Sequence, residues 1–248
     1  RYAVERLDSI STIRNEYAMV PLGVNEFIFT SDRAASTGDE KYGWTGEKFS
    51  DFYTTQLVDG QYLRPKKFTD VINTPGHEGT CTFNKSKTEM IFARTVVVGD
   101  KEDNFTQLYV AHKDGNGNWQ QATKLVLFGD DTLQNVGQPF LTEDGKSLFF
   151  SSDAQGGFGG KDLYVASRTA EGWSQPRNLG PNINSDKDEV FPFLRKDGLF
   201  FFSSNGLDGM GGLDIYYAQK TGWKFSRPTN LQWPMNSGGD DFAVFFTS

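Results

Sequence analysis

The feature that most constrains the fold of this chain is a pattern of residues that recurs along it. Its two most complete copies read Phe-Phe-Ser-Ser, then Gly-Gly-x-Asp followed by an apolar residue and Tyr, then Gly-Trp, and then Asn-Ser. The Asp of the pattern is Asp162 in one copy and Asp214 in the next, 52 residues later. Short strands that repeat every 40–50 residues or so (about one blade's length) are typical of a β-propeller. The repeat therefore predicts an all-β propeller.

One copy of the pattern shows how a blade forms. Glycines mark its turns, because Gly adopts the positive φ of a tight turn without steric cost. Between the turns lie runs of apolar residues of strand length, as expected for strands that pack on both faces. We expect four antiparallel strands in this copy, at residues 190–194, 199–203, 214–218 and 223–227.

The same frame, applied along the chain, predicts the number of blades. Four complete blades are expected at residues 16–72, 78–130, 136–184 and 189–236. Residues 240–248 match the first strand of a further blade, and residues 1–12 match a fourth strand with its crossover. Pairing both ends of the chain within one closing blade would remove exposed strand edges. We expect one propeller domain of five blades, or of six, taken from a larger multidomain protein.

Two segments of the pattern resemble a known family. The run Phe201-Phe202-Ser203-Ser204-Asn205, followed by Gly211-Gly212-Leu213-Asp214-Ile215-Tyr216, resembles the PD40, or TolB-like WD40, propeller repeat. The longer pattern is similar to the propeller of the OmpA-family multidomain proteins of Bacteroidetes, through Gly172-Trp173-Ser174-Gln175-Pro176 and Ile183-Asn184-Ser185. This resemblance implies a periplasmic propeller in a subunit of the type IX secretion system. It also implies a C-terminal OmpA-like module, outside these residues, that binds peptidoglycan.

The bulk composition excludes two classes of interaction. The net charge is −7, so the chain lacks the basic face that nucleic-acid phosphates require. No apolar run is long enough to cross a bilayer. Cys81 is the single cysteine, so no internal disulfide forms. It follows His77 by four residues, but a position on an inner strand favours a buried thiol over a nucleophile.

Acidic residues open the innermost strands of the blades, namely Glu16, Glu78, Glu189 and Asp241. Equivalent positions of a propeller surround one mouth of its channel, although Val136 interrupts this set. Such carboxylates can hold a cation such as calcium, or supply the acid and base of a glycosidase. They can instead accept N–H groups of the adjacent blade and lock the ring, which is the interpretation we favour. No cofactor is expected, with calcium left open.

A second acidic position recurs inside the blades. Asp51, Asp162 and Asp214 each follow a turn, where a carboxylate can accept backbone N–H groups. A role that is shared by the blades is a role in building the blade, so we assign these residues to structure. The tryptophans near the fourth strands are assigned in the same way: Trp119, Trp173 and Trp223.

The first blade departs from the pattern in one loop. Ten residues are inserted between residues 33 and 50, and this loop carries Tyr42, Trp44 and Phe49. Long loops with aromatic side chains are common binding elements, so these residues are candidates for partner binding. The same rings can equally fold back over the blade.

The recurring residues are used to build blades, so we expect a non-catalytic platform that binds other proteins of the envelope or of the secretion system. The resemblance implies that the full-length protein lies in the periplasm, tethered to the outer membrane and peptidoglycan. Two alternatives stay open: a propeller glycoside hydrolase, and a module that binds a small ligand or peptide at the channel mouth.

Overall fold

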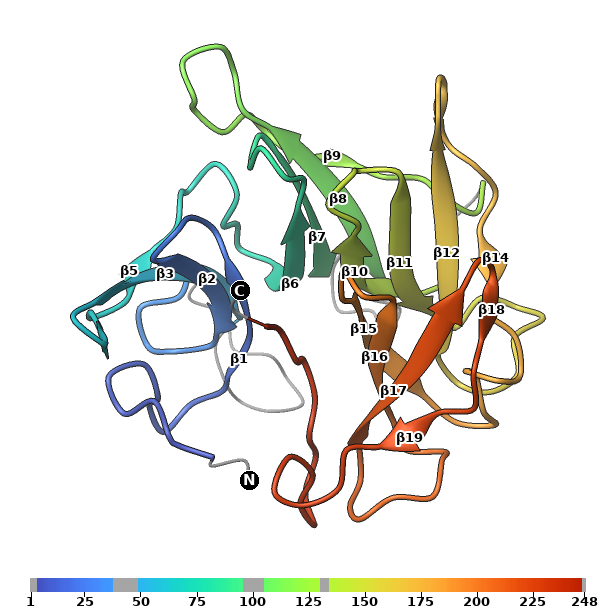
Figure 1. Cartoon of the computed structure of the whole chain (residues 1–248). Helices are drawn as coiled ribbons and strands as arrows, with labels where there is room; N and C mark the ends of the chain where they lie inside the picture. Colours follow the sequence, from blue (N-terminus) through green and yellow to red (C-terminus); the bar gives the residue numbers. More distant parts are fainter. Residues whose placement is uncertain (1–3, 38–48, 96–104, 130–133, 247–248) are drawn as a thin grey trace. The chain divides into compact units, whose positions relative to one another are not determined.

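The computed structural model describes residues 4–37, 49–95, 105–129 and 134–246, and the elements assigned in them are β-strands (Figure 1). The strands form four antiparallel sheets, each built from strands that follow one another in the sequence. This arrangement confirms the predicted all-β class and the antiparallel blades. Among these residues, no helix is long and apolar enough to cross a membrane.

Three of the four blades contain five strands each. The first blade consists of β1 (Glu16–Pro21), β2 (Glu26–Ser31), β3 (Asp51–Val58), β4 (Gln61–Tyr62) and β5 (Lys66–Lys67). The third consists of β10 (Val136–Leu141), β11 (Ser147–Ser152), β12 (Asp162–Thr169), β13 (Gly172–Trp173) and β14 (Arg177–Asn178). The fourth consists of β15 (Glu189–Leu194), β16 (Leu199–Ser204), β17 (Asp214–Thr221), β18 (Lys224–Phe225) and β19 (Thr229–Asn230). The second blade has β6 (His77–Phe83), β7 (Glu89–Thr95), β8 (Thr106–His112) and β9 (Thr123–Lys124).

The outer edge of a blade differs from the single fourth strand that the sequence predicts. In the fourth blade, the two-residue strands β18 and β19 pair separately with β17. Pro228 lies between them, and Pro65 and Pro176 occupy the same place in the first and third blades. Proline has no N–H group to donate to a ladder, so it interrupts the outer strand.

The innermost strand of each blade is irregular at one point. Its pairing with the second strand shifts register after the second residue of the strand. In three blades the next residue has a left-handed backbone, namely Ala18, Gln138 and Phe191 with φ of 53°, 44° and 53°. This conformation costs a non-glycine residue about 1 kcal/mol or more, so the surrounding ladder must hold it in place. The shift separates the first two residues of the strand, which include the crossover acid in the first, second and fourth blades, from the part that packs in the core.

The chain divides into two compact units, and each is described by itself. Residues 6–125 contain the first two blades, and residues 126–248 with residues 1–5 contain the other two. In the first unit, buried Ile28 and Phe52 pack with Phe92 of the second blade. In the second unit, the rings of Phe149 on β11 and Phe200 on β16 lie 5.2 Å apart and join the third blade to the fourth. Aromatic contacts between neighbouring sheets therefore form both cores.

The predicted closing blade does not form strands in the residues that the structure describes. Residues 4–15 and 240–246 lie outside the assigned strands. Phe242 nevertheless stacks on Phe191 of β15, with ring centroids 4.8 Å apart. The side chain of Ser203 donates a hydrogen bond to the carbonyl oxygen of Asp241 at 3.1 Å. The start of this segment packs against the fourth blade, and a fifth blade stays a prediction.

A buried asparagine fastens each of three crossovers to the third strand of its blade. Asn184, which is 3% exposed, accepts the N–H of Leu163 at 2.8 Å and donates to the carbonyl oxygen of the same residue at 3.1 Å. Asn73 and Asn236 form the same pair of bonds in the first and fourth blades. The asparagine side chain thus fixes the crossover to the third strand and accepts an N–H group of that strand.

Replacing Asn184 with alanine is expected to destabilise the protein by about 1–3 kcal/mol, because the buried N–H of Leu163 would lose its acceptor, while the carbonyl oxygen of Leu163 keeps the N–H of Leu179 at 3.0 Å. Urea unfolding of the whole chain measures the change. Asn182→Ala is the matched control, since Asn182 is exposed and makes one bond of 3.3 Å, to the carbonyl oxygen of Phe225. Equal losses in the two variants would contradict the assigned role of Asn184.

Candidate functional site

The candidate site is the end of each sheet where the crossover enters the blade. In the first and fourth blades, a crossover acid on the first strand, a serine on the second and an aspartate on the third lie side by side there. The third blade has Val136 in place of the crossover acid. In the fourth blade the register pairs Glu189 with Ser204, and Ser204 with Asp214. The first blade has Glu16, Ser31 and Asp51 at the same places. The ladder therefore brings the two predicted sets of acids together within one blade.

The crossover acids bind their own crossovers. The carboxylate of Glu189 accepts the N–H and the hydroxyl of Ser185 at 2.7 and 2.6 Å, and the hydroxyl of Ser204 at 2.6 Å. Glu16, Glu78 and Asp241 each accept the same two groups from the Thr or Ser four residues before them. The donors belong to the crossover, whereas the sequence suggested N–H groups of the adjacent blade. Each carboxylate closes a tight loop at the end of its crossover.

The second blade carries a different set of side chains at this end. Arg94 takes the place of the serine on the second strand, and its Nε lies 2.8 Å from the Glu78 carboxylate. Gln107 takes the place of the aspartate on the third strand. Arg94 also donates to the carbonyl oxygen of Ile72 at 2.7 Å. The exchange puts one positive charge beside Glu78 and removes one negative charge from the blade. The sequence analysis did not predict a role for Arg94 or Gln107.

Burial shifts the proton affinity of these acids. It raises the pKa of Glu78 to about 7, because desolvation outweighs the hydrogen bonds from Thr74 and the ion pair with Arg94. It also raises the pKa of Glu189, with the charge of Asp162 acting in the same direction. Both side chains have 0% relative exposure, so neither is placed to touch a dissolved substrate.

The aspartates of the third strand hold the glycine-rich turns, as their position in the pattern suggests. Asp162 accepts the N–H groups of Phe158 and Gly159 at 2.6 and 3.3 Å, and the side-chain amide of Asn178 at 2.7 Å. Asp214 accepts the N–H groups of Met210 and Gly211 and the amide of Asn230. In the first blade, Asp51 accepts the N–H and hydroxyl of Thr37 at 2.5 and 2.7 Å and pairs with Lys67 at 3.3 Å.

The three tryptophans assigned to structure lie at the outer edges of their blades. Each has a cation over its ring: Lys113 at 5.0 Å from Trp119, Arg168 at 4.4 Å from Trp173 and Arg177 at 4.4 Å from Trp223. Trp119 also packs against the core of the first unit. Trp223 is 54% exposed, so its ring covers little of the core.

Two of the loop aromatics, Tyr42 and Trp44, lie outside the described residues. Phe49 is described and is 4% exposed. Its ring meets the imidazole of His77 edge to face, with centroids 4.4 Å apart. Phe49 therefore covers the start of β6, as the folded-back interpretation of the loop requires.

The His77 and Cys81 pair does not form a thiol site. Cys81 is buried, and burial raises the pKa of its thiol. The Nδ1 atom of His77 lies 3.3 Å from the hydroxyl of Ser50, and burial lowers the pKa of this imidazole. Ser50 donates to the carbonyl oxygen of Glu78 at 2.8 Å, so its hydroxyl is engaged by backbone. Among the described residues, no group of three His, Cys, Asp or Glu side chains is arranged to hold a metal ion.

Comparison with solved structures shows the fold. The chain is similar to Zg3597, a family 117 glycoside hydrolase of Zobellia galactanivorans, with a TM-score of 0.57 and 13% identity over 88% of this chain and 69% of that one. It is similar to the xyloglucan PUL GH43B of Bacteroides ovatus, with a TM-score of 0.50 and 14% identity over 89% of this chain. TolB of Acinetobacter baumannii matches 72% of this chain with a TM-score of 0.44 and 15% identity. The fold is that of a β-propeller.

The likeness to these proteins extends over part of their length. This chain spans 37% of TolB and 41% of the Bacteroides ovatus protein. No family model matches the chain, and no curated protein matches it. At identities of 11–14%, the solved structures with TM-scores of 0.50–0.57 define the class of fold and no activity.

The raised pKa of Glu78 predicts how stability changes with pH. Because protonated Glu78 favours the folded state, it contributes to stability. This contribution is complete below the ordinary pKa of 4.5 and is lost as the pH rises through about 7. Over this interval we expect the parent to lose about 3 kcal/mol more unfolding free energy than the Glu78→Gln variant. Urea unfolding at a series of pH values measures the slope.

Two features keep this experiment interpretable. Glu78→Gln also removes the ion pair that an ionised Glu78 forms with Arg94, which changes the absolute stability, so the slope is the readout. Glu171→Gln is the control, because Glu171 is exposed and its replacement should leave the slope as in the parent. Parallel profiles for the parent and Glu78→Gln would contradict the raised pKa.

Calcium is expected to leave the melting temperature unchanged at millimolar concentration. The crossover carboxylates already accept two hydrogen bonds each from their crossovers, so binding a cation would require breaking them. Thermal unfolding with calcium or with a chelator tests this. A rise in melting temperature that Glu189→Gln abolishes would establish a cation site instead.

Proposed function

We propose that this propeller is a non-catalytic platform that binds other proteins of a bacterial envelope. One observation carries the proposal: the recurring polar residues form hydrogen bonds that hold the blades together. Glu189 binds its crossover, Asp162 binds its turn and Asn184 binds the third strand. The exposed surface of turns and crossovers is then left for recognition.

The glycosidase alternative requires two carboxyl groups that reach a sugar ring. Glu78 and Glu189 are fully buried, and their oxygens accept hydrogen bonds from protein groups. Glu16 pairs with Arg33 at 3.3 Å and accepts bonds from Thr12. A general acid must be able to approach the glycosidic oxygen, so this set of acids does not support the activity. The glycoside hydrolases among the similar structures share the fold.

The finer proposal follows from the sequence resemblance. We infer a propeller of the OmpA-family group that includes PorE, in a peptidoglycan-associated subunit of the type IX secretion system. In this proposal the full-length protein lies in the periplasm, and a separate OmpA-like module grips peptidoglycan. The partners of the propeller are then other secretion or envelope proteins. The pattern of Gly172-Trp173 and Ile183-Asn184-Ser185 supports the proposal.

Chemical cross-linking of the tagged full-length protein in intact cells, followed by mass spectrometry, tests this function. We expect envelope proteins to be linked to lysines of the propeller, at amounts comparable with the bait. A panel of aryl glycosides should release no more aglycone with the purified chain than with buffer.

The controls separate the two functions. A tagged version that lacks the propeller residues should lose the propeller-dependent cross-links and keep those of its other modules. Glycoside hydrolysis that disappears in the Glu78→Gln variant would overturn the proposal in favour of the enzyme. Absence of any propeller-dependent cross-link would also overturn it.

A further inference from the structure

Two apolar side chains stand at the same exposed place in the third and fourth blades. Phe158 and Met210 each precede the aspartate of the third strand by four residues, within turns made otherwise mostly of glycine. Phe158 is 50% exposed and Met210 is 44% exposed. Neither belongs to the buried cluster that joins these two blades. Because they occupy equivalent turns of neighbouring blades, both side chains lie at the same end of their sheets, where they can contribute to one binding surface.

The turns that carry these side chains are held in one conformation. The N–H of Phe158 donates to the carboxylate of Asp162 at 2.6 Å, and Met210 donates in the same way to Asp214. The glycines leave no room for larger residues: a Cβ on Gly159 would collide with the backbone of Lys187, and one on Gly211 with the backbone of Gly239. A fixed turn presents its side chain at a low cost in conformational entropy on binding.

The turns and crossovers at this end form one continuous surface, which we call the glycine-turn strip (residues 153–161, 185–188, 205–213 and 237–241). The N–H of Gly160 donates to the carbonyl oxygen of Lys187 at 2.8 Å, which ties the turn of the third blade to the next crossover. A Cβ on Gly206 would meet the side chains of Ser185 and Lys187, so the turn of the fourth blade packs on the same crossover. These segments lie along the lower side of this unit in Figure 1.

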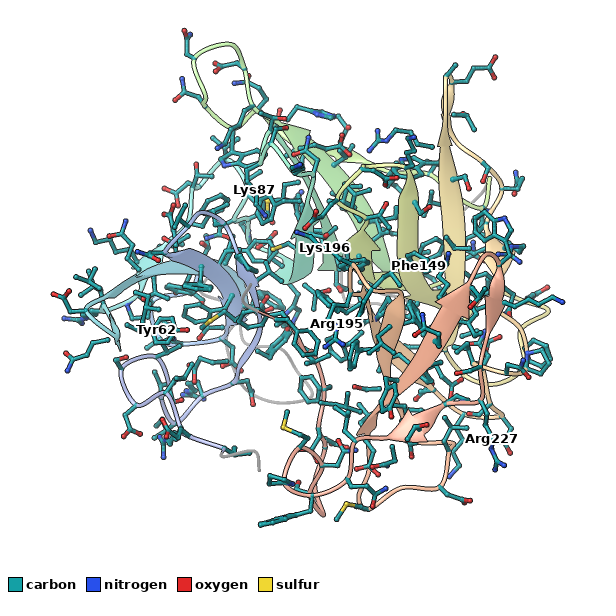
Figure 2. The ribbon with its side chains drawn as sticks, in the orientation of Figure 1. Tyr62, Lys87, Phe149, Arg195, Lys196 and Arg227 are labelled. Carbon is teal, nitrogen blue, oxygen red and sulfur yellow. The ribbon has the colours of Figure 1, made fainter. Side chains whose placement is uncertain are left out.

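The glycine-turn strip is acidic, and the opposite end of the same blades is basic. The strip contains six aspartates and two lysines, a net charge of −4: Asp153, Asp186, Asp188, Asp208, Asp240 and Asp241 with Lys161 and Lys187. The turns at the other end (142–147, 168–172, 195–198 and 220–224) contain four acidic and six basic residues, a net charge of +2. Arg195 and Lys196, labelled in Figure 2, belong to that other end. A partner of the strip is therefore attracted if it is positively charged.

We propose that the glycine-turn strip of the third and fourth blades docks a protein segment in which an apolar side chain is flanked by lysine or arginine. Phe158 and Met210 supply the apolar contact, and the aspartates around them attract the basic residues. The negative charge disfavours nucleic acids and anionic lipid surfaces, which leaves protein as the matching class of partner. This inference rests on the proposed platform function and assigns it a surface.

Short synthetic peptides provide a defined probe of this surface. One set carries leucine or phenylalanine between lysines, and a matched set has glutamate in place of each lysine. We expect the lysine peptides to bind the whole chain, and to bind at least about tenfold more weakly to the Phe158→Ser/Met210→Ser double variant. Raising the salt concentration should weaken the binding further. Fluorescence anisotropy of labelled peptides measures the affinity.

A matched variant at the opposite end is Ala170→Ser/Thr221→Ser, which changes two exposed residues and should bind like the parent. The melting temperature of both double variants should stay close to that of the parent, because all four side chains are solvent-exposed. Equal binding of lysine and glutamate peptides, unchanged binding by the Phe158→Ser/Met210→Ser variant, or no binding of either peptide would overturn the proposal.

A second experiment separates this proposal from the platform function itself. A photo-reactive amino acid is placed at Phe158 or Met210, or at Ala170 or Thr221, in the full-length protein in cells. Cross-links confined to positions 170 and 221 would overturn the docking surface and leave the platform function standing. Cross-links at none of the four positions would count against both. Cross-links at 158 and 210 support the proposal if the linked partner peptide contains the predicted basic and apolar residues.

Discussion

The structure of each blade depends on carboxylates that bind the backbone of the loops around them. A loop between two strands leaves N–H groups without ladder partners, and a buried one is costly unless a side chain accepts it. In the fourth blade, Glu189 serves the crossover that enters and Asp214 serves the turn that leads to the third strand. Because each carboxylate lies at the end of a strand, the ladder fixes its position, and the carboxylate in turn fixes the loop. Side-chain hydrogen bonds therefore hold these loops to the ends of the strands.

In the second blade, the end of the sheet where the crossover enters has different side chains, yet Glu78 still binds its crossover. Arg94 and Gln107 replace a serine and an aspartate on adjacent strands, and Glu78 gains an ion pair. A buried arginine needs acceptors for its several N–H groups, and here it finds the Glu78 carboxylate and the carbonyl oxygen of Ile72. The two changes are best understood as one exchange across paired strands.

The sequence predicts the strands of the blades well, because the apolar runs and the glycine turns carry that information locally. The role of Asp162 was also accessible, since it follows a turn whose N–H groups need an acceptor. The role of Asn184 could not be predicted, because a repeated Asn-Ser is typical of many turns, and only the structure shows that the third strand lies beside it. The role of Arg94 could not be predicted, because it depends on which residues lie opposite it on the two neighbouring strands. Composition leaves open whether Phe49 binds a partner or folds back over the blade, and in the structure its ring packs against His77.

The prolines at the outer edges also determine how these blades meet other copies of themselves. A continuous outer strand offers a row of free N–H and C=O groups on which a second sheet can grow. Pro65, Pro176 and Pro228 divide that edge into two-residue pieces, so an incoming strand would find too few consecutive partners to pair with. The interrupted edges of these three blades are therefore poor templates for sheet growth from a second copy of this chain.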